Sequence, residues 1–465
     1  MKKTFLALAL ACVAFAPARA QKKDIVKTGL NIGPLPVVAY DADKGLQLGA
    51  ILQLFDYGDG SRYPNYDSKW YFEASFFTKG SQLYQIMYDN KDLIPGVRWS
   101  SAINMTFDKG MDFFGFNGYK SYYDFNSITA GKNGETFIFT PFYKSNRIQI
   151  LAKSDFIGKI SGPLKWEAGY HLSWFKQGAI DYANINKGKS DLQRFPEPGE
   201  PGYVSTLFEL YRKWGIISDD EADGGLTSSI RAGLVYDTRD KEGAPSRGIW
   251  AEAHLTAAPK WLGTKNSFYR YSFTFRNYLP IVSNDILTFA YRLNYEGTIG
   301  SSAPYYILPY ITVMGDTPDR DGMGGYRTVR GIARNRVVGL DMATYTAEMR
   351  WRFARFHIGQ QNIALALNAF SDGAMVTRGR NLSFGYDPSA ADYATELQRY
   401  NSIVKNDVKE IPHITCGAGF RFIMNENFIV AAEYGLPISK FYKKDSPYYN
   451  QDGTGAFYVN IGYLF

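Results

Sequence analysis

The sequence contains recurring segments of about ten residues in which apolar and polar side chains alternate. The clearest examples are 267–279, 285–297, 342–353 and 455–465. A period of two indicates β-strands with one apolar face, which a soluble sandwich would also show. The length and recurrence of the segments favour a membrane barrel instead, because tilted strands need about ten residues to cross a bilayer.

Sixteen such segments can be counted along the chain. They are 34–40, 45–57, 68–79, 81–90, 97–107, 139–153, 163–175, 226–237, 247–257, 267–279, 285–297, 342–353, 361–371, 411–422, 427–436 and 455–465. An even number suits an antiparallel barrel with both termini on the periplasmic side, and closure removes strand edges that lipid could not satisfy. We therefore predict an all-β fold, a closed antiparallel transmembrane β-barrel of 16 strands.

The connections between these segments divide into two length classes. Gly162-Pro163, Val282-Ser283-Asn284 and Asn425-Glu426-Asn427 are short and predict periplasmic turns. The segments 176–225, 298–341, 372–410 and 437–454 are long and would face outward. Within the first of them, 203–214 could form a short amphipathic helix, although prolines just before it favour irregular chain.

Residues 1–20 have the form of a secretory signal peptide, with Lys2 and Lys3 followed by an apolar run and the small-x-small site Ala18-Arg19-Ala20. The mature chain would then start at Gln21. This leaves 21–33 as a short periplasmic N-terminal segment, too short for a folded domain, before a barrel at 34–465.

Composition supports the same class of protein. Aromatic residues make up 16% of the chain, which suits aromatic girdles at the two interfaces of a bacterial outer membrane. The formal charge of +7 falls to +4 without the signal peptide, a mild basicity that does not indicate a nucleic-acid partner. Cys416 would be the only mature cysteine, and we expect it to be a buried small apolar residue.

The candidate functional site begins in a glycine-rich loop between Asp321 and Gly339, which contains Arg330. Strand parity places Glu348 and Asp372, on the next two strands, toward the lumen. If the loop bends inward, the planar guanidinium of Arg330 could engage both carboxylates. The alternative is that these are three unrelated charges in a lumen that also receives Arg270, Arg276, Arg292, Arg350 and Arg352.

At these residues the sequence resembles the BamA/TamA superfamily, the bacterial surface antigen barrels. Val329-Arg330-Gly331 resembles the Val-Arg-Gly-aromatic signature of that family, and Phe370-Ser371-Asp372 resembles its Phe-x-Asp motif. Glu348 is similar to the acid on the strand before that motif. The segments 233–240 and 245–248 resemble the family's eighth and ninth strands with their turn. The resemblance thus implies a lumen loop anchor made of Val329, Arg330, Gly331, Glu348, Phe370 and Asp372.

The same resemblance implies partners. Phe457, Tyr463 and the C-terminal Phe465 resemble the assembly signal that the barrel-assembly machinery recognises when it inserts such a chain.

The sequence departs from the family pattern in two ways. Ile332 replaces the aromatic residue of the signature, and the POTRA domains of typical members are not expected here, so a separate periplasmic partner would replace them.

Catalytic, cofactor and metal sites are not expected. His171, His254, His357 and His413 are the only histidines, and no two of them have metal-ligand spacing. The chain has no Gly-x-Ser-x-Gly motif, although a spatial triad cannot be read from sequence. Asp237, Arg239 and Asp240 could look like a catalytic cluster, but we interpret them as stabilising a periplasmic turn.

The resulting functional hypothesis is a protein that contacts outer-membrane lipid and assembles, inserts or translocates protein or lipid at that membrane. Two alternatives to this hypothesis stay open. A passive or gated pore is favoured by the arginine-rich lumen, and an enzyme is the least favoured class. The substrate, and whether the first and last strands separate, do not follow from the sequence.

Overall fold

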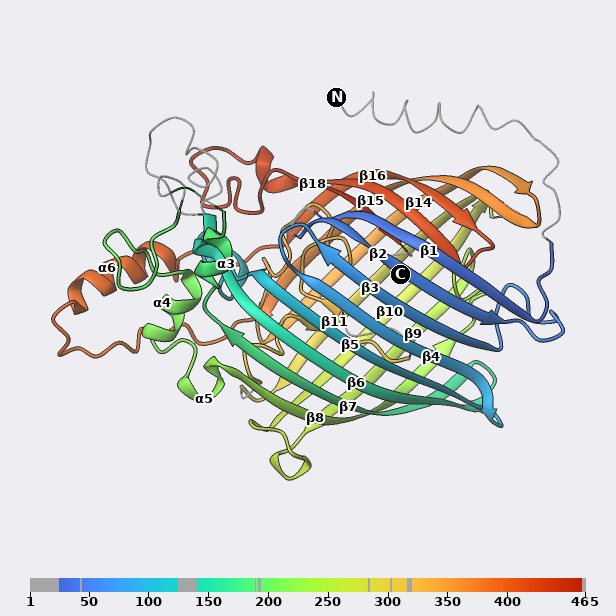
Figure 1. The fold of residues 1–465 in the computed structure, drawn as a ribbon, viewed down its shortest axis with the longest axis horizontal. Helices are drawn as coiled ribbons and strands as arrows, with labels where there is room; N and C mark the ends of the chain where they lie inside the picture. The colour runs from blue at the N-terminus through green and yellow to red at the C-terminus, as the bar shows by residue number, and fades with distance from the viewer. Residues whose placement is uncertain are drawn as a thin grey trace.

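Sixteen antiparallel strands close into a barrel in the computed structural model (Figure 1). The structure describes residues 25–41, 44–123, 140–188, 190, 194–282, 285–301, 303–315 and 320–461. Each strand pairs with its neighbours in chain order, and the first pairs with the last to close the barrel. This confirms the predicted fold class.

The strands have the following bounds. They are β1 (Leu30–Asp41), β2 (Gly45–Asp56), β3 (Ser68–Phe77), β4 (Gln82–Ile94), β5 (Val97–Asp112), β6 (Lys144–Ser161), β7 (Leu164–Gly178), β8 (Gly224–Asp237), β9 (Gly248–Ala258), β10 (Phe268–Val282), β11 (Leu287–Ile299), β14 (Asp341–Ile358), β15 (Gln361–Arg378), β16 (His413–Met424), β17 (Phe428–Pro437) and β18 (Ala456–Ile461). A separate two-stranded sheet is formed by β12 (Tyr310–Ile311) and β13 (Arg320–Asp321).

Every predicted segment overlaps one observed strand of the barrel, and the differences lie at strand ends. The first strand begins at Leu30 rather than at 34, and β14 continues to Ile358 rather than ending at 353. A register shift between Arg352 and Ala354 interrupts the alternation, so the pattern ends before the strand does. The predicted signal peptide lies outside the described residues, and its boundary with the 21–33 segment stays a prediction.

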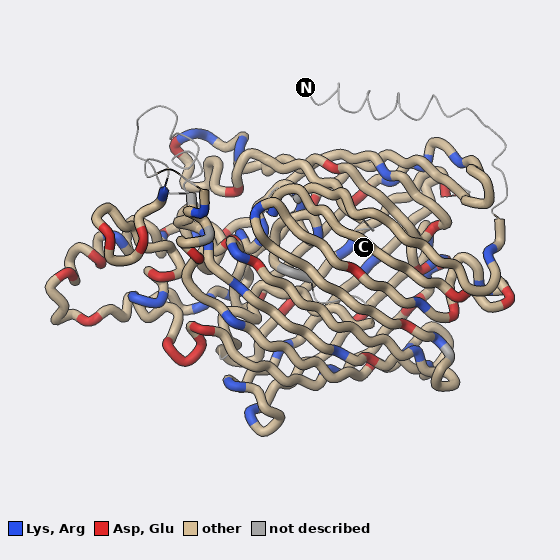
Figure 2. Tube along the Cα trace, viewed as in Figure 1, with Lys and Arg blue, Asp and Glu red and all other residues tan. Residues whose placement is uncertain are grey.

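The alternating pattern sorts side chains between lipid and lumen. On β8, Leu226, Ile230 and Leu234 are exposed, whereas the intervening Ser229 and Arg231 are buried. Charged residues also occur along the wall of the barrel (Figure 2), and many of those on the strands are buried in the lumen. The lumen is therefore a packed, charged interior.

The extracellular end carries short helices, of which α4 (Leu207–Lys213), α5 (Asp219–Ala222) and α6 (Tyr393–Ile403) lie at one end of the barrel in Figure 1. The predicted helix at 203–214 is thus observed as α4. Its N-cap is Thr206, whose hydroxyl oxygen accepts from the backbone N–H of Glu209 in a capping box. Buried aromatic residues of α4 pack with those of several extracellular loops into one apolar cluster. This cluster covers the outer end of the barrel.

Among the described residues, no helix is both long and apolar enough to cross a bilayer.

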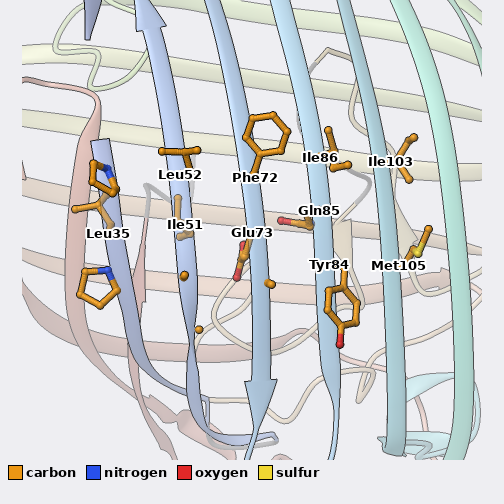
Figure 3. A pocket seen from close by; sticks show the side chains of 15 residues that line it. Leu35, Ile51, Leu52, Phe72, Glu73, Tyr84, Gln85, Ile86, Ile103 and Met105 are labelled. Carbon is orange, nitrogen blue, oxygen red and sulfur yellow. The ribbon is translucent and has the colours of Figure 1, made fainter. Parts of the chain in front are cut away.

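Two features concern the outer wall. Cys416 is exposed, which corrects the expectation that it is buried. His413 and Thr415 of β16 are buried, and Cys416 has the opposite parity, which places its side chain on the outer face. A shallow apolar groove of ≈ 850 Å³ crosses β1 to β5, and Leu52, Phe72, Ile86 and Ile103 form a row of cross-strand neighbours along it (Figure 3).

Candidate functional site: a loop anchored in the lumen

The connection from β11 to β14, described at residues 300–301, 303–315 and 320–340, folds back into the barrel. Its apolar residues Met323, Val329, Ile332 and Val337 are buried in one cluster with Met342 of β14 and with Ala374 and Val376 of β15. Thr328 stiffens the turn, since its hydroxyl donates to the carbonyl oxygen of Gly324 and accepts from the Gly324 N–H. The loop is therefore held against the inner wall by both packing and hydrogen bonds.

Arg330, at the inner end of this loop, is fully buried and makes a bidentate ion pair with Asp372 of β15. Its Nε lies 2.8 Å from Oδ2, and its Nη2 lies 2.9 Å from Oδ1. The backbone N–H of Arg330 also donates to Oδ2 at 3.0 Å. Three donors from one residue thus bind one carboxylate, and the two guanidinium donors form the bidentate geometry in which arginine makes its strongest pairs.

Two further acids meet the remaining guanidinium nitrogen. Nη1 of Arg330 lies 2.6 Å from Glu348 of β14 and 2.9 Å from Glu433 of β17. Arg421 of β16 contacts the same two glutamates at 3.0 and 2.7 Å, and Arg350 contacts Glu348 at 2.7 Å. Three carboxylates and three guanidinium groups therefore share a buried network, which offsets the cost of removing each charge from water.

An aromatic ring completes the surroundings of Arg330. The guanidinium carbon lies 3.5 Å from the ring centroid of Phe370, a close cation–π contact. Phe370 occupies space left by Gly417 of β16, because a Cβ built at Gly417 would meet the ring at 2.3 Å. The backbone N–H of Gly331 donates to the Tyr458 hydroxyl at 3.2 Å, so the loop also contacts the last strand, β18.

The sequence-derived residues fall into three groups. The structure brings Arg330, Gly331, Glu348, Phe370 and Asp372 into contact within the lumen. Val329 is buried, but in the apolar cluster beside this network. Phe457 is exposed on the outer face of β18, while Tyr463 and Phe465 lie outside the described residues.

Sequence reasoning missed Glu433 and Arg421. Both occupy lumenal positions on strands whose other residues are mostly apolar or small, so parity places their side chains in the lumen but does not identify their partners. No motif marks them, because their partners are distant in sequence. Asp237 and Arg239 form a local ion pair of 3.0 Å at the turn after β8, in agreement with their interpretation as turn residues.

The fold and the anchored loop define a transmembrane barrel of the bacterial outer membrane with an extracellular loop folded into its lumen. The sequence profile of the Omp85 superfamily domain matches residues 112–465. The chain belongs to this superfamily, which confirms the family resemblance.

Solved structures with similarity to the chain include BamA from Haemophilus ducreyi lacking POTRA domains 1-3 and CdiB from Escherichia coli. The BamA structure is 14% identical with a TM-score of 0.49, and the match covers 94% of this chain and 70% of that one. The CdiB structure is 10% identical with a TM-score of 0.49, and the match covers 94% and 62%. Among curated proteins, no sequence matches this chain significantly.

Proposed function

We propose that this protein assembles, inserts or translocates protein or lipid at the outer membrane, and that Arg330 anchors the lumenal loop for that activity. The Omp85 superfamily match supports the general class. The observation that carries the mechanism is the contact between the loop and β18. Because the Gly331 N–H donates to the Tyr458 hydroxyl, the position of the loop is linked to the strand that closes the barrel.

The closure itself supports an opening seam between β1 and β18. Among the described residues, Tyr40 of β1 and Val459 of β18 are the register partners that join these two strands. By contrast, β1 and β2 pair continuously from Leu30 with Asp56 to Asp41 with Gly45. Pro34 and Pro36 also remove two backbone donors from β1. Fewer backbone hydrogen bonds at this seam would lower the free energy needed to separate the two strands there.

A disulfide across the seam would test this proposal. In a Cys416→Ser background, Tyr40→Cys with Val459→Cys joins β1 to β18, because these residues are register partners. The matched control, Tyr40→Cys with Leu46→Cys, joins β1 to β2 and leaves the seam free. Each variant would be expressed in a strain lacking the protein, and outer-membrane protein and lipid composition would be measured.

We expect the variant with the seam disulfide to restore the outer-membrane composition of the deletion strain only after a reductant is added. The variant with the control disulfide should restore it with or without reductant. Full rescue by the oxidised seam variant would exclude a mechanism in which these strands separate.

A pore is the second candidate, because buried arginines line the lumen. These are Arg270, Arg292, Arg350 and Arg352, and a partly buried Arg276 lies beside them on β10. Against a wide channel, three cavities lined by lumenal residues have volumes of only ≈ 10, 30 and 60 Å³, which is room for at most a few water molecules. Large, steady, anion-preferring conductance in planar bilayers, with unchanged outer-membrane composition in the deletion strain, would favour the pore.

The proposed partners are outer-membrane lipid, the barrel-assembly machinery for the chain's own insertion, and a periplasmic protein that delivers substrate. The exposed position of Phe457 on β18 is compatible with recognition from outside the barrel. Co-purification from the native membrane would identify the periplasmic partner.

A further inference from the structure

A second charged cluster lies in the lumen, apart from the Arg330 network. It consists of Glu167 on β7 and of Glu252 and His254 on β9, all of them at least nine-tenths buried. One potential donor atom from each residue lies within 4.8 Å of the others. Glu167 is near the start of β7 at Leu164, so the cluster is in the periplasmic half of the barrel.

The local sequence explains why these side chains meet. Glu252 and His254 are two residues apart on one strand and therefore share a face. Glu167 is separated from them by β8, where its register partner is Gly233, which is also the partner of His254. A Cβ at Gly233 would lie 2.5 Å from the His254 Cβ and 2.7 Å from a Glu167 carboxylate oxygen. Because Gly233 has no side chain, the side chains of Glu167 on β7 and His254 on β9 can meet over β8.

These groups are poorly satisfied by the protein alone. Both carboxylate oxygens of Glu167 and both ring nitrogens of His254 are buried without a hydrogen-bond partner, as is Oε1 of Glu252. Two other buried histidines differ from His254. His171 and His413 each lie 2.6 Å from an aspartate oxygen, at Asp155 and Asp452. Burying polar atoms without partners is costly, and it suggests that something else occupies the space between them.

The two separations that involve His254 are close to those expected around a small divalent cation. Nδ1 of His254 lies 3.4 Å from Oε1 of Glu167 and 3.2 Å from Oε1 of Glu252, which is beyond and at the upper end of the usual range for N–H···O hydrogen bonds. Zinc–ligand bonds of about 2.0–2.2 Å in tetrahedral geometry separate neighbouring donors by roughly 3.3–3.5 Å. An imidazole donor suits zinc or a similar transition ion better than calcium or magnesium, which prefer oxygen ligands.

We propose that Glu167, Glu252 and His254 bind one divalent transition cation, with Zn²⁺ as the best fit, and that a water molecule completes the tetrahedron. Neutral His254 and two ionised glutamates carry a charge of about −2, which the cation balances. The second carboxylate oxygen of Glu252, Oε2, accepts a hydrogen bond from the Trp250 indole N–H at 3.0 Å, and this interaction orients the carboxylate. The bound ion would join β7 to β9 across β8.

The competing occupant is a proton on His254, shared between the two glutamates. Metal-stripped protein in detergent would be titrated with Zn²⁺ in competition with a chromophoric chelator, and Co²⁺ would be added to report coordination geometry. We expect one equivalent of Zn²⁺ to bind and Co²⁺ to give the intense visible bands of a tetrahedral site. Heat-modifiable migration on gels would check that each variant remains folded.

Glu167→Gln and His254→Gln should weaken binding by more than the ~10–100-fold that loss of an outer hydrogen bond costs. His171→Gln, which changes another buried lumenal histidine, should leave binding unchanged. The absence of stoichiometric Zn²⁺ binding to the wild-type protein, or equal binding by the His254→Gln and His171→Gln variants, would overturn the proposal and assign the site to a proton. These binding measurements use purified protein, so their outcome does not depend on whether the protein has the proposed assembly function.

Discussion

Gly331 in the lumenal loop and Gly435 on β17 touch backbone to backbone. A Cβ at Gly435 would lie 2.5 Å from the Arg330 carbonyl oxygen, and a Cβ at Gly331 would lie 2.6 Å from the Gly435 carbonyl carbon. Gly331 also has φ of +98°, which side chains rarely adopt. The loop therefore reaches the wall only because both contact positions lack a side chain.

Gly435→Ala should push the loop away from β17 and destabilise the barrel by about 1–3 kcal/mol, the usual cost of overpacking. The measurement is the temperature at which the folded band is lost on semi-native gels. Gly178→Ala is the matched control, because a Cβ at this strand glycine meets nothing within 4 Å. Equal shifts for the two variants would show that the contact adds nothing beyond glycine's own effect.

Arg330→Ala should destabilise the barrel more strongly, by about 3–5 kcal/mol, because Asp372, Glu348 and Glu433 lose a shared buried cation. Earlier heat unfolding on the same gels would report this loss. Arg378→Ala is the control, because the partly exposed Arg378 side chain pairs with Asp341 at the edge of the barrel. An ion pair that exposed contributes only ~0–1 kcal/mol.

The charge balance can be tested separately. Adding Glu433→Gln to Arg330→Ala removes one uncompensated acid and should recover part of the loss, whereas Glu433→Gln alone should destabilise the network. Such opposite signs identify direct coupling in a double-mutant cycle. Additive effects of the two changes would mean that Arg330 and Glu433 do not interact energetically.

Alternation along the strands predicted which side chains share a face, and the length and recurrence of the alternating segments, rather than alternation alone, predicted the closed barrel. Parity also placed Glu348 and Asp372 in the lumen. It could not predict that Glu433 joins them, since that contact depends on how far the loop penetrates and on Gly435. The cluster of Glu167 and His254 was missed for the same reason, because it forms across an intervening strand at Gly233.

The turn between β8 and β9 provides a pH-dependent contact. Burial raises the pKa of Glu242, but the charges of Arg98 and Lys91 outweigh this and lower it from 4.5 to about 2. Ion pairs of 3.3 and 3.1 Å join Glu242 to these residues. Because the folded pKa is the lower one, the carboxylate stabilises the protein above pH 4.5, and this contribution is lost as the pH falls toward 2.

We therefore expect Glu242→Gln to lower the unfolding temperature at pH 7 and to have a progressively smaller effect between pH 4.5 and 2. The difference between wild type and variant isolates this group from others that titrate in the same range. A difference that stays constant over that interval would mean that the pKa of Glu242 is not depressed.

The periplasmic side of the seam is bridged by contacts outside the strands. The side-chain amide of Asn427, in the turn between β16 and β17, donates to the Tyr57 hydroxyl at 3.0 Å and to the Pro64 carbonyl oxygen at 2.9 Å. Tyr57 and Pro64 belong to the turn between β2 and β3. These bonds therefore join the two sides of the barrel across β18 and β1, and they should hold the seam closed where strand pairing is weak.

Asn427→Ala should let the seam open more often, because two hydrogen bonds of about 0.5–1.5 kcal/mol each are lost. Backbone amides of β1 should then exchange with deuterium on the order of 10-fold faster, since ~1.4 kcal/mol corresponds to a factor of ten. Amides of β9, on the far side of the barrel, should keep their rates. Asn401→Ala changes an exposed asparagine on α6 and should leave both strands unaffected. If Asn427→Ala accelerates β9 as much as β1, the substitution has loosened the whole barrel, and the turn contact does not control the seam.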